Sequence, residues 1–145
     1  MSTTELEDNK MVKLIIGVKG SGKTKTLIEM VNAALANSSG SVVCIEKGNK
    51  LIYDIKYQAR LIDTDQYLVD DAKSLFGFMA GILASNHDVT DLFVDSALKI
   101  CNNDIDAFEK MIAALDKLSS VIGCNVVMTS SLPVEEASDF VKKYL

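Results

Sequence analysis

Short apolar runs alternate with stretches of helical periodicity along most of this 145-residue sequence. The clearest helical stretch runs from Leu27 to Leu35, where apolar residues recur at the spacing of one helix face. The short apolar runs, several of them rich in Val and Ile, have the length of buried strands. They cover residues 12–16, 41–46, 60–63, 91–95 and 125–129.

Further helices are predicted between and after these strands. An Asp-Asp pair opens a predicted helix over 70–85, because aspartate is favoured at helix N-termini. Other helices are predicted over 104–121 and after Pro133, whereas residues 47–59 fit either a short irregular helix or a loop with one strand-like piece. Strands that alternate with helices pair in parallel. The sequence therefore predicts a three-layer α/β fold, with a parallel sheet of about five strands and helices on both faces.

Composition is that of an ordinary soluble globular protein, with 48% hydrophobic and 24% charged residues. Residues 1–10 are polar and acidic and are predicted to be a flexible tail, which leaves 11–145 as a single domain. The longest run without a polar side chain, 75–84, has about half the length that a membrane-spanning helix needs. With no signal-peptide pattern, these features predict a cytoplasmic protein without a transmembrane helix.

Charge and cysteine content exclude several functions. The net charge is −5 and Arg60 is the single arginine, so nucleic acid is not an expected partner and an arginine-rich kinase lid cannot be built. The three cysteines, Cys44, Cys101 and Cys124, form no CxxC motif and are accompanied by one histidine. This pattern fits neither a disulfide framework nor a zinc site.

Residues 17–24 read Gly-Val-Lys-Gly-Ser-Gly-Lys-Thr and match the phosphate-binding motif GxxxxGK[ST]. Glycines let the backbone turn its N–H groups inward around an anion. Lys23 is expected to reach the β- and γ-phosphates, and the Thr24 hydroxyl is expected to bind Mg²⁺. The helix that follows directs its positive end at the same phosphates.

With a strand before it and a helix after it, this segment resembles the Walker A loop of the P-loop NTPase superfamily, and the resemblance covers nearly all of 11–145. The resemblance implies that ATP and Mg²⁺ are bound, with an acidic residue at the tip of another strand holding the metal through water. Asp95, after the apolar run 92–94, is the favoured candidate, and Asp63 is the alternative. ATP is the expected nucleotide because the guanine-reading motif of GTPases is absent from the sequence.

An aspartate on the fourth predicted strand is similar to the branch of the superfamily that includes RecA and the rotary ATPases. The resemblance implies that Glu46, at the end of the second strand, activates the attacking water; the alternative is an exposed glutamate at a strand end. It also implies that Thr129 or Ser130 senses the γ-phosphate. Ser96 departs from the AAA+ ATPases, which carry a second acid at that position.

The resemblance to RecA-type ATPases, which work as rings or filaments, implies a possible homo-oligomer or another protein partner, with Arg60 as the arginine available to a neighbouring site. The predicted function is a Mg²⁺-dependent ATP-binding protein with slow ATP hydrolysis. The alternatives are a nucleotide-gated binding module and, less favoured, a small-molecule kinase. The predicted residues are Lys23 and Glu46 for catalysis, Thr24 and Asp95 for the metal, and Gly17, Gly20, Ser21, Gly22, Lys23, Thr24, Lys25 and Thr129 for the nucleotide.

Overall fold

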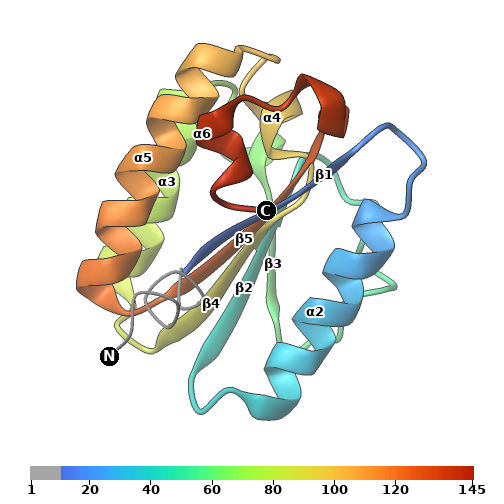
Figure 1. Cartoon of the computed structure of the whole chain (residues 1–145). Helices are drawn as coiled ribbons and strands as arrows, with labels where there is room; N and C mark the ends of the chain where they lie inside the picture. The colour runs from blue at the N-terminus through green and yellow to red at the C-terminus, as the bar shows by residue number, and fades with distance from the viewer. Residues whose placement is uncertain (1–10) are drawn as a thin grey trace, which may run out of the picture.

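A sheet of five parallel strands forms the centre of the computed structural model, which describes residues 11–145 (Figure 1). The order of the strands is β1-β5-β4-β2-β3, and every pairing is parallel. The predicted α/β fold is therefore confirmed, whereas the predicted tail lies outside the described residues. The strands are β1 (Val12–Gly17), β2 (Ser41–Glu46), β3 (Arg60–Asp63), β4 (Val89–Val94) and β5 (Asn125–Ser131).

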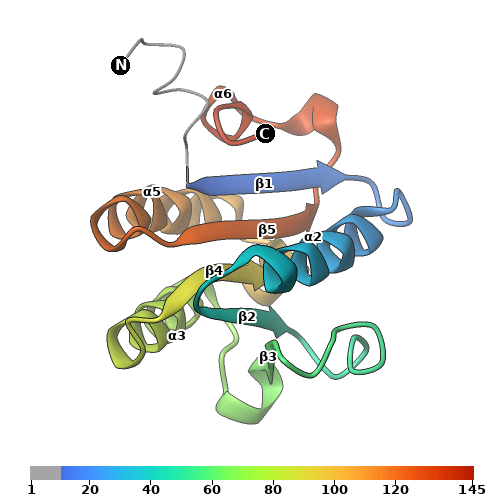
Figure 2. The same ribbon diagram turned by 90° about the horizontal axis from the view of Figure 1, so that it is seen from below.

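Long helices cover both faces of the sheet, α2 on one face and α3 with α5 on the other (Figures 1 and 2). They are α2 (Lys23–Asn37), α3 (Ala72–Ser85) and α5 (Ile105–Ile122). Alternate side chains of β2 enter the two cores: Val43 and Ile45 pack on the α3–α5 side, and Val42 and Cys44 on the α2 side. Burial on both faces is typical of an inner strand of a parallel sheet. None of the described helices is long and apolar enough to cross a membrane.

Capping residues fix where α3 begins and where α5 begins and ends. Asp71 accepts a hydrogen bond from the Ser74 N–H at 2.7 Å, and the Ser74 hydroxyl oxygen accepts one from the Asp71 N–H at 3.1 Å. Asp104 accepts a hydrogen bond from the Ala107 N–H at 3.1 Å, and Gly123, whose φ is 82°, directly follows the last residue of α5. Each cap contributes about 1 kcal/mol. The two helix starts predicted from the sequence are confirmed.

The C-terminal segment differs from the helix predicted after Pro133. A single 3-10 turn, η2 (Val134–Glu136), is followed by the short helix α6 (Asp139–Lys142). Ser138 lies between them in an extended conformation, and its hydroxyl oxygen accepts a hydrogen bond from the Val141 N–H at 3.1 Å. Because a serine in this position caps a new helix, the chain starts a second short helix instead of extending the first.

The connections at the carboxyl ends of the strands also contain structure that periodicity does not reveal. Residues 47–59 form successive turns, with Leu51 and Ile55 buried against the α2 side of the sheet. The 3-10 turn η1 (Thr64–Tyr67) follows β3, and the short helix α4 (Ala97–Ile100) lies where a loop is expected. Both η1 and α4 are too short to show a helical repeat in the sequence.

The cysteines provide a test of the core. Cys44, Cys101 and Cys124 are free thiols with side chains that are almost fully buried. Burial raises the pKa of Cys44 and Cys101 to about 12 and that of Cys124 to about 11. Because the thiolate is the reactive form, we expect no thiol to react with Ellman's reagent at pH 8 in the folded protein and all three to react in guanidinium chloride. Rapid labelling of the native protein would contradict this packing.

Candidate functional site

The glycine loop, residues 17–24, joins the carboxyl end of β1 to the start of α2. All three of its glycines, Gly17, Gly20 and Gly22, have a positive φ that other residues rarely adopt. Gly22 precedes α2 with a φ of 90°, and a Cβ on Gly17 would approach the Ser21 hydroxyl oxygen to 2.6 Å. No side chain caps the N-terminus of α2, so the N–H groups of its first turn remain available to an anion.

Lys23 lies at the first position of α2 and folds back over the glycine loop. Its Nζ donates a hydrogen bond to the Val18 carbonyl at 2.8 Å and is 3.5 Å from the Ser21 hydroxyl oxygen. No described carboxylate lies within ion-pair distance of this ammonium group. The positive charge of Lys23 is therefore not neutralised by a described carboxylate and is available to an anion in the loop.

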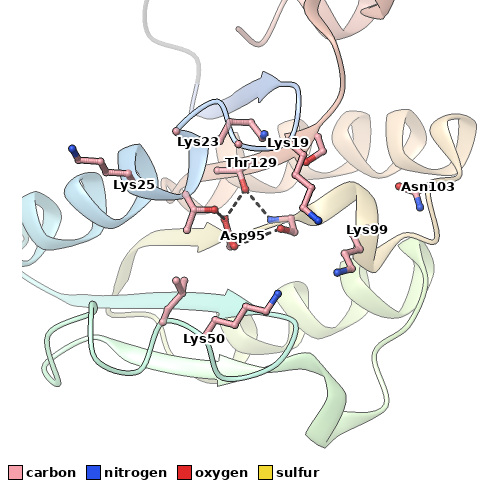
Figure 3. A pocket seen from close by; sticks show the side chains of 14 residues that line it. Lys19, Lys23, Lys25, Lys50, Asp95, Lys99, Asn103 and Thr129 are labelled. Atoms are coloured by element: carbon pink, nitrogen blue, oxygen red, sulfur yellow. Dashed lines mark hydrogen bonds between the residues drawn. The ribbon is translucent and has the colours of Figure 1, made fainter.

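Asp95 forms the centre of a polar cluster that unites three elements (Figure 3). Its Oδ1 accepts hydrogen bonds from the hydroxyls of Thr24 on α2, at 3.1 Å, and Thr129 on β5, at 2.8 Å. The Thr129 oxygen also accepts a hydrogen bond from the Ser96 N–H at 2.8 Å. The cluster lies at the carboxyl ends of the strands, where parallel α/β sheets bind ligands.

Asp63, the alternative candidate for the metal, lies elsewhere. Its Oδ1 accepts hydrogen bonds from the N–H groups of Gly48, at 2.8 Å, and Asp65, at 2.9 Å, and so caps η1. The structure thus brings Asp95, and not Asp63, next to Thr24. A hydroxyl and a single carboxylate suit Mg²⁺, which keeps several waters and binds substrate phosphates.

A cavity of about 700 Å³ lies above this cluster, and five lysines line it. Asp95 is the one carboxylate among its described lining residues, although the chain carries a net charge of −5. The ion pairs of the described residues, Lys47–Asp65 and Lys142–Asp139, involve none of these lysines. A positive cavity in an acidic protein favours a polyanionic ligand. The lysines are Lys19, Lys23, Lys25, Lys50 and Lys99.

Several lining residues were not identified from the sequence. Lys50, Lys99, Asn103 and Ser131 line the cavity together with the glycine loop. Each of these residues ends a strand or follows one. Because parallel strands bring their carboxyl ends to the same edge of the sheet, this position in the sequence is the one signal that could have indicated them. Of the predicted nucleotide-binding residues, Gly20, Gly22, Lys23, Thr24, Lys25 and Thr129 line the cavity, whereas Gly17 and Ser21 shape the loop behind it.

Glu46 is at the end of β2 but is 2% exposed and does not line the cavity. Its two carboxylate oxygens accept hydrogen bonds from the N–H groups of Lys50, at 3.0 Å, and Leu51, at 3.1 Å. Burial raises the pKa of Glu46, and these two hydrogen bonds oppose the rise. The carboxylate therefore stabilises the turn after β2, and its role in activating water stays a prediction.

The remaining predicted residues occupy distinct places. Ser130 is buried, accepts a hydrogen bond from the Leu98 N–H at 3.2 Å and does not line the cavity, so of the two sensor candidates only Thr129 faces it. Arg60 begins β3 and pairs with Val43, at the amino end of the strand and away from the cavity. Arg60 therefore contributes no charge to the site of its own chain.

Comparison with known proteins adds evidence on the fold alone. No protein-family model matches the sequence, and no curated protein matches it. Among solved structures, PCH-2 of C. elegans, an AAA+ ATPase, is similar over 97% of this chain, with a TM-score of 0.55 and 14% identity. This chain spans 35% of the length of that one. The likeness agrees with the parallel α/β fold of the described residues.

Proposed function

We propose that this chain binds ATP with Mg²⁺ at the glycine loop and hydrolyses it slowly. The observation that carries the proposal is the cavity that five lysines and one carboxylate line at the uncapped start of α2. A triphosphate matches this charge distribution, because the loop N–H groups and lysines neutralise the phosphates while the carboxylate remains for a metal.

Each residue of the site has a task in this proposal. Lys23 would leave the Val18 carbonyl and bind the β- and γ-phosphates, and the N–H groups of the glycine loop would hold the phosphate oxygens. Thr24 would ligate Mg²⁺ directly and Asp95 through water, while Thr129 orients the Asp95 carboxylate. Bound Mg²⁺ would neutralise the negative charge that develops on the phosphates.

Slow hydrolysis is proposed because nothing in the described cavity is placed to polarise an attacking water strongly. The Glu46 oxygens are occupied by backbone N–H groups, and Arg60 is distant from the cavity. The same observation favours a second candidate function, a nucleotide-gated binding module in which hydrolysis is incidental. Assignment to the RecA and rotary-ATPase branch is part of the proposal and is supported by the contact between Thr129 and Asp95.

Phosphate release from MgATP, followed over a wide range of protein concentrations, tests the proposal. We expect a slow rate that exceeds that of a Lys23→Ala control. A rate per subunit that climbs with concentration would indicate a site shared between subunits, and a constant rate would indicate that one chain suffices. MgATP binding without release above the control would favour the binding module, and absence of both would reject the proposed function.

A further inference from the structure

Two of the lysines that line the cavity, Lys50 and Lys99, belong neither to the glycine loop nor to α2. Lys50 lies in the turns after β2, and Lys99 lies on α4 after β4. Both side chains are exposed, and neither has a carboxylate within ion-pair distance among the described residues. In Figure 3 both ammonium groups point into the cavity from the sides that the glycine loop does not occupy. Their charges are therefore available to a ligand.

The backbone of Lys50 is fixed by a buried carboxylate. Glu46 accepts hydrogen bonds from the N–H groups of Lys50 and Leu51, and Leu51 is itself 4% exposed. An acidic side chain is almost never buried without such partners. The turn is thus held by the two hydrogen bonds to Glu46 and by the buried Leu51 side chain. Lys50, which lines the cavity, lies next to Leu51 in this turn.

The backbone of Lys99 is fixed by the end of β5. The Ser96 N–H donates a hydrogen bond to the Thr129 hydroxyl at 2.8 Å, and the Leu98 N–H donates one to the Ser130 hydroxyl at 3.2 Å. Ser96 has a φ of 59°, a left-handed conformation that a residue with a Cβ adopts only when its surroundings hold it there. Lys99 is the one exposed residue of α4, so this anchored helix presents its charge to the cavity.

We propose that Lys50 and Lys99 form a clamp for the terminal phosphate of a bound nucleoside triphosphate, and that Glu46 is a positioning residue for Lys50. The inference rests on the proposed function. Thr24 and Asp95 would hold the metal, which would neutralise negative charge on the phosphates. Figure 3 shows Asp95 between Lys23 on one side and Lys50 on the other. The terminal phosphate, which Lys23 would contact from the side of the glycine loop, would then meet Lys50 and Lys99 on its other side.

The clamp gives the site a preference for a triphosphate over a diphosphate. ADP lacks the terminal phosphate that Lys50 and Lys99 would contact, whereas Lys23 and the glycine loop would also contact the β-phosphate, which both nucleotides carry. The two lysines would also supply, within one chain, positive charge that Arg60 cannot deliver to its own cavity. Selectivity and affinity are therefore expected to depend on different lysines.

Calorimetric titration with MgATP and with MgADP tests the clamp in the full chain. For Lys50→Ala and for Lys99→Ala we expect the MgATP affinity to fall about tenfold, with a change of less than about twofold for MgADP. Lys117→Ala, which removes an exposed lysine on α5 outside the cavity, is the matched control and should change neither affinity. Equal losses for both nucleotides, or none for either, would overturn the clamp.

Glu46→Gln separates positioning from water activation. The side-chain amide of glutamine has one oxygen that accepts hydrogen bonds and one nitrogen that only donates them. The turn would therefore lose one of the two hydrogen bonds that Glu46 accepts from the N–H groups of Lys50 and Leu51. We expect the ATP-over-ADP preference to fall as in Lys50→Ala, with no further fall when both substitutions are combined. Unchanged affinities with lost phosphate release would instead assign Glu46 to water activation and reject its positioning role.

The controls distinguish failure of the clamp from failure of the proposed function. If the wild-type protein binds neither nucleotide, the proposed function and the clamp are both wrong. If Lys23→Ala abolishes binding while the Lys50 and Lys99 variants keep the ATP-over-ADP preference, the proposed function stands and the clamp alone is rejected. Thermal unfolding of each variant without nucleotide verifies that it remains folded.

Discussion

Replacing Lys23 by alanine is expected to lower the affinity for MgATP by about a hundredfold or more, the value of two charge-assisted hydrogen bonds to phosphate. Among residues 11–145, the Lys23 ammonium group forms hydrogen bonds only with the Val18 carbonyl and the Ser21 hydroxyl of its own loop. The substitution therefore removes no contact with the core. Calorimetry with MgATP measures the loss, and circular dichroism during heating should show nearly the same unfolding midpoint as the wild type.

Lys117→Ala again serves as the control for a general loss of positive charge, because Lys117 is exposed on α5 and does not line the cavity. The decisive comparison is made at low ionic strength, where a nonspecific attraction between lysines and ATP would be strongest. If Lys23→Ala and Lys117→Ala weaken binding equally, the glycine loop is not the nucleotide site.

Asp95→Asn is expected to remove the magnesium dependence of ATP binding and to slow phosphate release by about a hundredfold or more, since metal stabilisation of transition-state charge contributes several kcal/mol. Asparagine keeps an oxygen that can accept the hydrogen bonds of Thr24 and Thr129, so the substitution changes charge more than shape. Phosphate release measured over a series of Mg²⁺ concentrations, with calorimetry at high Mg²⁺ and in EDTA, gives both quantities.

Asp63→Asn is the matched control, because it makes the same chemical change at the other candidate carboxylate. Asp63 caps η1 by accepting hydrogen bonds from the N–H groups of Gly48 and Asp65 at one oxygen, which asparagine retains, so the stability should change little. We expect its magnesium dependence to remain that of the wild type. The reverse result, with Asp63→Asn insensitive to Mg²⁺ and Asp95→Asn normal, would move the metal site to η1.

Elements whose signals are local were predicted well. All five strands were predicted, and the starts of α3 and α5 followed from Asp71 and Asp104, which hydrogen-bond to N–H groups within three residues of themselves. The segment after Pro133 was predicted wrongly as one helix, because its division into two short elements depends on a single cap at Ser138. A serine inside an otherwise helical pattern does not reveal whether it caps a new helix.

Glu46 shows how a correctly predicted element can leave the task of its side chain undetermined. The end of β2 was predicted, and the carboxylate there was expected to face the attacking water. Its direction depends on the turn that follows, whose N–H groups occupy both oxygens. That turn lies in residues 47–59, which have no hydrophobic period, so no pattern indicated how the backbone would fold over the carboxylate.

The sequence by itself determined the glycine loop, its flanking strand and helix, and the adjacent pair of Lys23 and Thr24. These features depend on residues within a few positions of one another: glycines that permit a positive φ, and apolar spacing that selects strand or helix. Only the tertiary structure decided that Asp95, 71 residues away, stands beside Thr24, and that Lys50 and Lys99 line the same cavity. These neighbours depend on the order of the strands, which follows from burial summed over the whole sheet and is encoded in no single segment.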